Sequence, residues 1–577
     1  MAHPRIKKAI QIVTITLISF SCTDNFLDVT PNGLLNDEVL ATEEGIEALL
    51  IGAYSMLDGV SSQGFGWEAA SSNWLLGSVR AGEANRGSDS GDSNYGSIVI
   101  QNFIENSTTP LLNTKWASLY EAISRCNHVI SVTHTALKKG TINDTTATLY
   151  LMQARGLRGH YHFEAWRIWG KIPFVDENTG WEVTSNKVDQ TERIFEDLEY
   201  ATSLPHKMKM IGQFNSTVVK VIYAKALMDI KGDFTKAQTL LSDVIANGCK
   251  PDGSPIGLES NYGDIFDTEN RNGIESIYTV QYSVNDGSGG WNGGWGEALN
   301  FPVKAGSSPA GCCGFFQPTF EFVNSFRTQA GLPLLDKSYN DDPILSDMGL
   351  MPTDPFIEDT NPVDPRLDWT VGRRGIPYLD WGEHTGSDWI REQSFAGPYS
   401  PKKQVYRKSQ EGTLTETGSW TKGFTANGYR MIRYADVLLL LAECQLETGN
   451  LKDALTNVNL IRTRAGNPSG FVMETDNITP AANYQIQPYT SFPDIDYARA
   501  AIRMERKLEL GLEGHRFFDL RRWGIAQNEI NSILSYETSR LSQMYIPGIR
   551  FGNEDLFYPI PQHQIDLSNG RITQNTR

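Results

Sequence analysis

Two tryptophans in a glycine-rich segment are the residues of this sequence best suited to binding chemistry. Trp291 and Trp295 lie four positions apart in GGWNGGWG, where five glycines in eight positions leave no stable helix. An indole displayed on such a loop can stack on the apolar C–H face of a sugar ring while neighbouring polar groups bond the hydroxyls. The alternative is that each indole packs its own loop onto the scaffold. We expect at least one of the two to contact a ligand.

Two more insertions, residues 59–97 and 364–403, are rich in aromatic and turn-forming residues. Loops this long in a compact chain are usually functional or disordered, and their aromatic content argues against disorder. Five of their residues are further candidate ligand contacts: Trp67, Asp89, Tyr95, Trp381 and Trp389. The Asp89 carboxylate could accept hydrogen bonds from hydroxyl groups, although an acidic loop residue more often faces water or forms a turn. For the aromatic residues, packing against the scaffold is the alternative.

Patterns for catalysis and metal binding are weak. His160 and His162 are two positions apart in a helical segment and point to different faces, which makes them a poor metal pair. The sequence contains no HExxH, no Walker A loop and no GxGxxG that opens a helix. A glycoside hydrolase needs two placed carboxylates, which 68 acidic residues do not exclude by number alone. We expect no catalytic residue, no metal and no cofactor.

The segments between the insertions predict helices. Apolar residues recur every three or four positions in residues 150–168 and 432–461, which is the spacing of one buried helix face. The run ERKLELGLEGHR, which contains Glu505 and Glu509, alternates in charge and predicts a helix held by salt bridges.

An internal repeat indicates how the helices pair. Residues 224–245 parallel residues 441–462 when Gly232 is aligned with Gly449, and small and apolar residues then coincide. This pattern resembles the second half of a tetratricopeptide repeat. We therefore expect a mainly α chain: a scaffold of tetratricopeptide-like helical pairs with long irregular ligand-binding insertions.

The charge balance excludes one class of partner. The chain of 577 residues carries 51 basic and 68 acidic residues, a formal net charge of −17. So acidic a surface repels phosphate backbones, and no basic stripe offsets it. We expect no nucleic-acid partner.

The first 21 residues predict an export signal. Basic residues precede an apolar run, Ala9–Phe20, which as a helix would span about 18 Å, too short for a hydrocarbon core of about 30 Å. Cys22 follows small residues, as in a bacterial lipoprotein signal whose cysteine becomes acylated. Ser19 stands where such signals usually have leucine, so secretion with a free Cys22 is the alternative. We expect several acyl chains on Cys22 to hold the protein on a membrane.

Cys312 and Cys313 are adjacent in GCCGFF. Adjacent Cα atoms are at most about 3.8 Å apart, below the usual disulfide range, so closing that ring would strain the peptide. Gly311 and Gly314 could absorb the strain, and an exported protein meets oxidising conditions. A vicinal disulfide and a turn with two free thiols both remain open.

Six segments of the chain form a recognisable combination. In chain order they are Cys22 with DNFLDVTP behind it, ARGLRGHYHFEAWRIWGKIPFV, the repeat around GDFTKA, YRMIRYADVLLLLAECQLETGNLKDAL, IRMERKLELGLEGHRFFDLRRWG and FYPIPQHQIDLSNGRITQN. Their combination in this order is specific, covers essentially the whole mature chain and resembles the SusD/RagB family of outer-membrane lipoproteins of Bacteroidetes. The resemblance implies a signal peptide over 1–21 and a SusD-like domain over 22–577, with a helical-repeat part about 22–280 and a loop-rich C-terminal part about 281–577.

The resemblance also implies a function. Members are non-enzymatic surface proteins that bind oligosaccharides or polysaccharides, or peptides in some cases, and work with a SusC-like TonB-dependent transporter. The ligand face is the most variable part of the family, so no site residue is carried over. We expect a lipid-anchored protein on the cell outer membrane that captures glycans for uptake, with peptide capture as the alternative. A glycoside hydrolase or lyase and a helical scaffold that binds only proteins are less favoured.

Overall fold

The computed structural model describes residues 36–62, 66–92, 96–180, 182–303, 308–309 and 311–575. The predicted export signal, Cys22 and Tyr95 lie outside these ranges. Within them, long helices occupy two blocks, 110–247 and 434–538, and the chain between the blocks consists mainly of loops with short helices and strands. The predicted mainly α class with long irregular insertions is confirmed.

The first block is a series of helices in which each packs on the one before. It consists of α5 (Pro110–Lys139), α6 (Asp144–Trp169), α7 (Thr191–Ala201), α8 (Ser216–Ala226) and α9 (Phe234–Asn247), with α3 (Glu43–Ser55) packed on α5 and α6. The turn between α5 and α6 shows why they separate: Gly140 ends α5 with a φ of 71°, and the Asn143 side chain caps α6 by accepting the Thr146 N–H at 2.9 Å.

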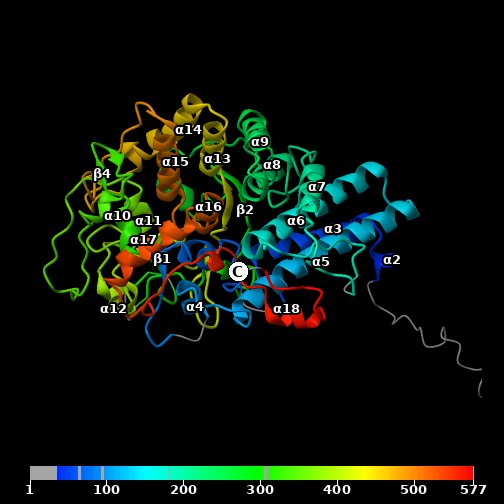
Figure 1. The fold of residues 1–577 in the computed structure, drawn as a ribbon, viewed down its shortest axis with the longest axis horizontal. Coiled ribbons are helices and arrows are strands. Elements are labelled where there is room, and N and C mark those ends of the chain that lie inside the picture. The colour runs from blue at the N-terminus through cyan, green and yellow to red at the C-terminus, as the bar shows by residue number, and fades with distance from the viewer. Residues whose placement is uncertain are drawn as a thin grey trace, which may run out of the picture.

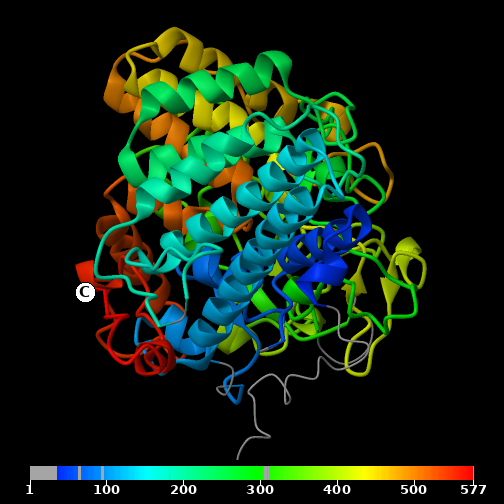
Figure 2. The same cartoon turned by 90° about the vertical axis from the view of Figure 1, so that its right-hand side faces the viewer.

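The second block continues the same layer. It consists of α13 (Tyr434–Glu447), α14 (Leu451–Ala465), α15 (Ile495–Leu510), α16 (Arg516–Arg522) and α17 (Ala526–Thr538). Because α13 packs on α9, the helices α6 to α9, α13 and α14 follow one another across the molecule (Figure 1). Figure 2 is seen from the end of this row at which α6 to α9 lie, so α13 and α14 stand behind them. No helix in the described ranges is long and apolar enough to cross a membrane.

The predicted repeat pairs are formed. Gly232 and Gly449 have φ values of 65° and 90° at the two turns, as their aligned positions require. The aligned residues of the second helix in each pair are at most 1% exposed: Ala237, Leu241, Val244, Ala454, Val458 and Ile461. The contact between α9 and α13 brings the two pairs together. The proposed division of the chain near residue 280 stays a prediction.

Short elements fill the region between the blocks and the ends of the chain. The short α-helices are α2 (Asp37–Leu40), α4 (Ser97–Gln101), α10 (Phe320–Asn324), α11 (Leu367–Thr370), α12 (Gln393–Ala396) and α18 (Gln562–Leu567). The strands form antiparallel pairs: β1 (Ala84–Gly87) with β3 (Phe315–Pro318), β2 (Ser276–Thr279) with β10 (Arg430–Arg433), β4 (Thr328–Gln329) with β5 (Leu332–Pro333), β6 (Val371–Gly372) with β7 (Ser400–Pro401), and β8 (Thr415–Glu416) with β9 (Phe424–Thr425). The β2–β10 pair matters most for function, because it sets the loop after β2 beside the segment before β10.

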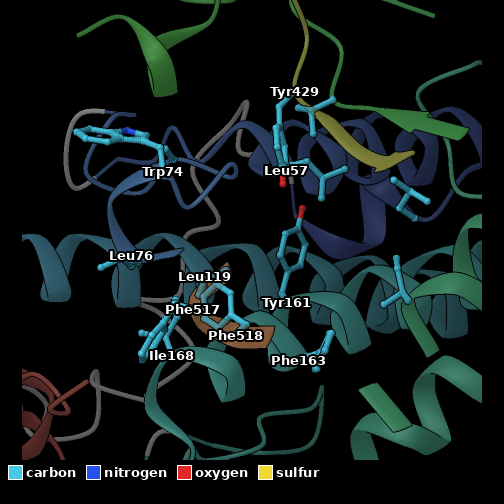
Figure 3. Packing of buried hydrophobic residues seen from close by; sticks show 14 of the residues in the cluster. Leu57, Trp74, Leu76, Leu119, Tyr161, Phe163, Ile168, Tyr429, Phe517 and Phe518 are labelled. Carbon is cyan, nitrogen blue, oxygen red and sulfur yellow. The ribbon is translucent and has the colours of Figure 1, made fainter. Parts of the chain in front are cut away.

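The hydrophobic core joins distant parts of the chain. Tyr161 of α6 lies near Leu57, which follows α3, and near Tyr429, which precedes β10, and the two tyrosine hydroxyls point toward each other (Figure 3). The Tyr161 hydroxyl donates to the Ala53 carbonyl at 2.8 Å. The α3, α6 and β10 regions are therefore held in one packed unit.

A buried ionic network fixes α15 to the rest of the protein. Glu509 is fully buried and accepts hydrogen bonds from Arg433 at 3.1 Å and from Arg464 at 2.5 Å. Glu505, one turn earlier, accepts from Arg366 at 2.6 Å. The predicted salt-bridged helix is confirmed, and because Arg366 belongs to the 364–403 insertion, the same network ties that insertion to the scaffold.

Candidate ligand-binding site

Four aromatic rings from two loops form one cluster, which we call the tryptophan platform. Trp291 stacks on Trp295 with 4.6 Å between ring centroids and 22° between ring planes. Trp295 also contacts Phe424 at 4.5 Å and Trp420 at 6.0 Å. Trp295 and Phe424 are only 5% and 1% exposed, whereas Trp291 and Trp420 are 54% and 40% exposed. The platform therefore has a buried base and two indoles that face solvent.

Backbone hydrogen bonds hold the first loop in place. The loop after β2 closes through the Ser283 N–H, which donates to the Asn292 carbonyl at 2.8 Å, and the Gly294 N–H donates to Thr425 of β9 at 2.9 Å. The Trp295 indole N–H donates to the Gly290 carbonyl at 2.9 Å. These bonds fix the backbone on both sides of Trp291, so its exposed ring is held rather than free.

Glycines let both loops approach Phe424. A Cβ atom added at Gly290 would lie 2.5 Å from the Phe424 ring, and one added at Gly418 would lie 2.2 Å from it. Real Cβ atoms do not make such contacts, so these two positions require glycine for close packing. The glycines that mark the segment in the sequence thus build the base of the platform.

The loops that carry the exposed indoles also carry carboxylates. Asp286 accepts hydrogen bonds from the Ser288 N–H at 2.9 Å and from the Asn292 amide at 2.8 Å. The hydrogen bonds from Ser288, followed by those from Asn292, hold the pKa of Asp286 well below its usual range. Glu416 accepts from the Asn285 N–H at 2.7 Å. The surroundings of the indoles are acidic and rich in hydrogen-bond acceptors.

Trp420 is a functional candidate that sequence analysis missed. It lies in GSWTKGF between Gly418 and Gly423, the same type of surroundings as Trp291. The signal was therefore present, but the segment is short and lies outside the three long insertions that the sequence analysis considered. The hairpin of β8 and β9 carries Trp420, and the hydrogen bond from the Gly294 N–H to the Thr425 carbonyl sets this hairpin beside the loop of Trp295.

Three predicted tryptophan contacts are packed inside the protein instead. Trp67 and Trp389 are 6% and 2% exposed, and Trp295 forms the base of the platform. Indoles this deeply buried offer little surface for stacking, so the structure favours the packing role that the sequence left as the alternative. Trp381 is half-buried and donates its indole N–H to the Tyr406 carbonyl at 3.0 Å, which also fixes it to a local core.

Asp89 is paired within the protein. Its carboxylate forms an ion pair with Arg391 at 2.7 Å and accepts from the Gly91 N–H at 3.0 Å. This is the turn-forming role that the sequence left open. Because these contacts occupy carboxylate oxygens, Asp89 has fewer acceptor positions for a ligand. Arg391 also donates to the Cys313 carbonyl at 3.3 Å, so the pair links the 59–97 and 364–403 insertions to the cysteine turn.

The two adjacent cysteines are joined in the structure. A disulfide connects the Sγ atoms of Cys312 and Cys313. Their turn packs against the segment after Trp420, because a Cβ at Gly311 would meet Thr421 and Gly423. The oxidation state in the native protein stays a prediction.

The two histidines that the sequence places on one helix are buried in α6. Burial lowers the pKa of His160 to about 4 and that of His162 to about 3, so both are neutral at physiological pH. No group of three or more histidine, cysteine or acidic side chains in the described residues could hold a metal ion. The feature that stands out chemically is the tryptophan platform.

Comparison with known proteins agrees with this architecture. The SusD family profile matches residues 274–577. A SusD-like protein of Bacteroides ovatus is 25% identical over 296 residues, 48% of this chain and 50% of that protein, so the match spans about half of that relative. The SusD-like protein P2 of Formosa agariphila is 24% identical over 89% of this chain and 90% of its own length.

Solved structures show the same fold. A SusD superfamily protein of Bacteroides vulgatus has a TM-score of 0.65 at 18% identity and covers 92% of this chain and 98% of its own. A surface glycan-binding protein A of Bacteroides thetaiotaomicron, solved in complex with laminarihexaose, has a TM-score of 0.63 at 21% identity. The match covers 92% of this chain and 99% of that protein. A protein described as a laminarin binding SusD-like protein has a TM-score of 0.63 at 20% identity. The match covers 92% of this chain and 99% of that protein. Because the family profile matches more than half of its residues, this chain belongs to the SusD family.

Proposed function

We propose that this protein captures oligosaccharide or polysaccharide chains by stacking sugar rings on the tryptophan platform, without cleaving them. The observation that carries this proposal is the exposure of Trp291 at 54% while it is stacked on the buried Trp295. Exposed apolar patches mark interaction sites on protein surfaces, and the platform exposes both Trp291 and Trp420. A flat ring held in place suits the apolar face of a sugar and loses little entropy on binding.

The expected ligand is a neutral glycan. Asp286 and Glu416 lie on the loops of the platform, and the low pKa of Asp286 keeps its charge across the physiological range. Carboxylates accept hydrogen bonds from hydroxyl groups but repel sulfated or carboxylated sugars. The laminarin and laminarihexaose ligands named for the structural neighbours support this class, because both are neutral glucans.

The proposal also places the protein on the outer surface of the cell. An acylated Cys22 would hold it in the outer membrane, and a SusC-like TonB-dependent transporter would take up the captured chain. The family assignment and the predicted export signal support this arrangement. No residue of the transporter contact is assigned.

Affinity electrophoresis of the mature chain, residues 22–577, tests glycan capture. Gels carrying neutral or acidic polysaccharides are run with the wild type, with Trp291→Ala and with Trp420→Ala. We expect retardation by a neutral polymer and its loss in at least one variant. Ile478→Ala is a matched control, because Ile478 is 80% exposed on a different loop.

Three results would each overturn part of the proposal. Retardation by no polysaccharide would reject glycan capture, and binding of peptides in a competition assay would then support the alternative. If the purified protein releases reducing ends from a polymer that retards it, the proposal that it binds glycans without cleaving them is rejected. Retardation that survives both tryptophan variants would keep glycan binding and remove the platform as its site.

A further inference from the structure

A groove of about 470 Å³ lies next to the tryptophan platform. Its walls come from α3, from the segment around Met210, and from the chain that follows β2. Ile51 and Met210 are 52% and 41% exposed at its edge, and Leu57 and Val280 are buried in its floor. We call this cavity the α3 groove.

Two chain connections make the groove continuous with the platform. Asn292, which lines the groove, directly follows Trp291 in the sequence. On the other side, Asp58 lines the groove and accepts the Val60 N–H at 2.7 Å, while Val60 packs in the cluster of Trp295 and Phe424. A chain stacked on Trp291 would therefore have its next unit at the mouth of the groove.

The lining of the groove differs in chemistry from the platform. The platform is aromatic and suits flat C–H faces, whereas Ile51, Leu57, Met210 and Val280 are aliphatic and suit small alkyl groups. Tyr54 and Tyr278 also line it, but the Tyr278 hydroxyl donates to the Gly212 carbonyl at 2.7 Å and is already used. Other polar side chains also line the groove, those of Ser55, Gln213, Gln281, Ser283 and Asn292, but none of them is a carboxyl group.

Asp58 supplies the carboxyl group of the groove. Its Oδ1 atom accepts a hydrogen bond from the Val60 N–H. Burial raises the pKa of the Asp58 carboxyl group to about 7, while that hydrogen bond and the charge of Arg125 act to lower it. A carboxyl group in such a position gains from a ligand N–H or O–H donor, which would replace lost hydration. Aliphatic walls beside a carboxyl group fit an alkyl group that lies next to a hydrogen-bond donor.

We propose that the α3 groove is a second subsite, which takes the methyl group of an acetamido sugar or a 6-deoxy sugar while the neighbouring ring stacks on Trp291. The methyl lies between Ile51 and Met210, and an adjacent N–H or hydroxyl donates to Asp58. This subsite rests on the proposed glycan capture, and it narrows the ligand class to glycans that carry methyl-bearing sugars. Burial of one methyl group should favour such a sugar over its unsubstituted counterpart by about fourfold in affinity.

Saturation-transfer NMR on the mature chain tests the subsite with single sugars, so the linkage of the natural glycan does not matter. The probes are N-acetylglucosamine, L-rhamnose and D-glucose. We expect the acetyl methyl, the rhamnose C6 methyl or both to receive more saturation than the ring protons, and glucose to show weaker transfer. Comparison of the first two probes distinguishes the acetamido from the 6-deoxy source.

Variants at the edge of the groove connect the signal to the site. Ile51→Asp and Met210→Asp are exposed positions that should fold normally, and each should reduce the methyl signal, while Ile478→Asp should not. Methyl signals no stronger than the ring signals, or unchanged in both groove variants, would overturn the subsite and leave the groove to another occupant such as a protein partner.

Trp291→Ala separates this subsite from the proposed function. The variant should lose retardation by the polymer in affinity electrophoresis but keep the methyl signal of the single sugars. If no polymer retards the wild-type protein while the methyl signal depends on Ile51, glycan capture on the platform is rejected and the subsite in the groove is supported. If retardation depends on Trp291 while no methyl signal depends on the groove, glycan capture on the platform is supported and the subsite in the groove is rejected.

Discussion

Trp291 is stacked on Trp295 at 4.6 Å, yet the two indoles have opposite exposures, 54% and 5%. One ring faces solvent and the other supports it from the core. The sequence left ligand contact and structural support open for each indole, and the structure gives the exposed position to Trp291 and the supporting position to Trp295. The two roles can be separated by mutation.

Trp291→Ala and Trp295→Ala should differ in their effects on stability. We expect Trp291→Ala to abolish polysaccharide retardation and to change the free energy of unfolding by about 1 kcal/mol or less, because only an exposed stacking contact is lost. Trp295→Ala should also abolish retardation, but it should lower the free energy of unfolding by about 3–5 kcal/mol because it opens a buried site. Denaturant titration of both variants measures this, and equal losses of stability would contradict the division of roles.

Gly290→Ala should damage the platform while Gly287→Ala should not. The two glycines have nearly equal φ values, 87° and 86°, so a Cβ strains both backbones equally, by about 1–2 kcal/mol. Only the Cβ at Gly290 meets the Phe424 ring, at 2.5 Å; nothing lies within 4 Å at Gly287. We expect a lower melting temperature and weaker retardation for Gly290→Ala than for Gly287→Ala. Equal effects would show that backbone strain alone matters.

The sequence could predict the helical scaffold because its signals are local. The repeat around Gly232 and Gly449 specifies the turns and the buried face, and the structure has both. Long apolar periodicity needs no knowledge of distant residues. The helical class and the paired helices were therefore correctly predicted.

The candidate site was only half predictable because it depends on contacts between distant segments. Glycine-rich surroundings identified Trp291, but whether an indole is exposed depends on what covers it. Trp389 is covered by an aromatic cluster that includes Phe301, and Trp420 comes to the platform because Gly294 bonds to Thr425, far along the chain. Neither relation is encoded in local composition, so exposure could not be read from the sequence.

Cys22→Ala should release the protein from the membrane fraction. An acylated cysteine is the attachment point that the export signal predicts, and the described residues contain no helix that could replace it. We expect the variant to appear in the soluble fraction after cell fractionation, with unchanged glycan binding. Sedimentation of the variant with membranes would show that the protein is held there by other means.

Glu509→Gln should strongly destabilise the fold. The change removes a negative charge that faces Arg433, Arg464 and Arg366 inside the protein. Breaking a buried ionic network from one side typically costs about 3–5 kcal/mol, because the remaining charges lose their partner. The control is Glu447→Gln, which breaks a partly exposed pair with Arg499 and should cost at most about 1 kcal/mol. Denaturant titration of both variants measures the difference, and similar losses would show that the buried network adds little.

Glu537 should make stability fall as the pH rises from about 5 to 8. Burial, followed by the nearby charge of Glu321, raises the pKa of Glu537 to about 8 from an ordinary value of 4.5. Between these two values the folded protein keeps a proton that the unfolded chain releases, so each rise in pH in this window favours unfolding. Below about 4.5 both states are protonated and the group has no effect.

Glu537→Gln should remove this pH dependence. The amide oxygen can still accept the Glu321 N–H, which Glu537 accepts at 2.8 Å, and no proton is exchanged. We expect the variant and the wild type to have equal free energies of unfolding near pH 5. At pH 8 the free energy of unfolding of the variant should exceed that of the wild type by at least roughly 1.4 kcal/mol, the value of one pKa unit, and its melting temperature should be higher. Glu554→Gln, at an exposed ion pair with Arg550, controls for the loss of one negative charge and should show no such gain. Equal changes in melting temperature between pH 5 and 8 in the wild type, Glu537→Gln and Glu554→Gln would mean that Glu537 is already ionised in the folded protein.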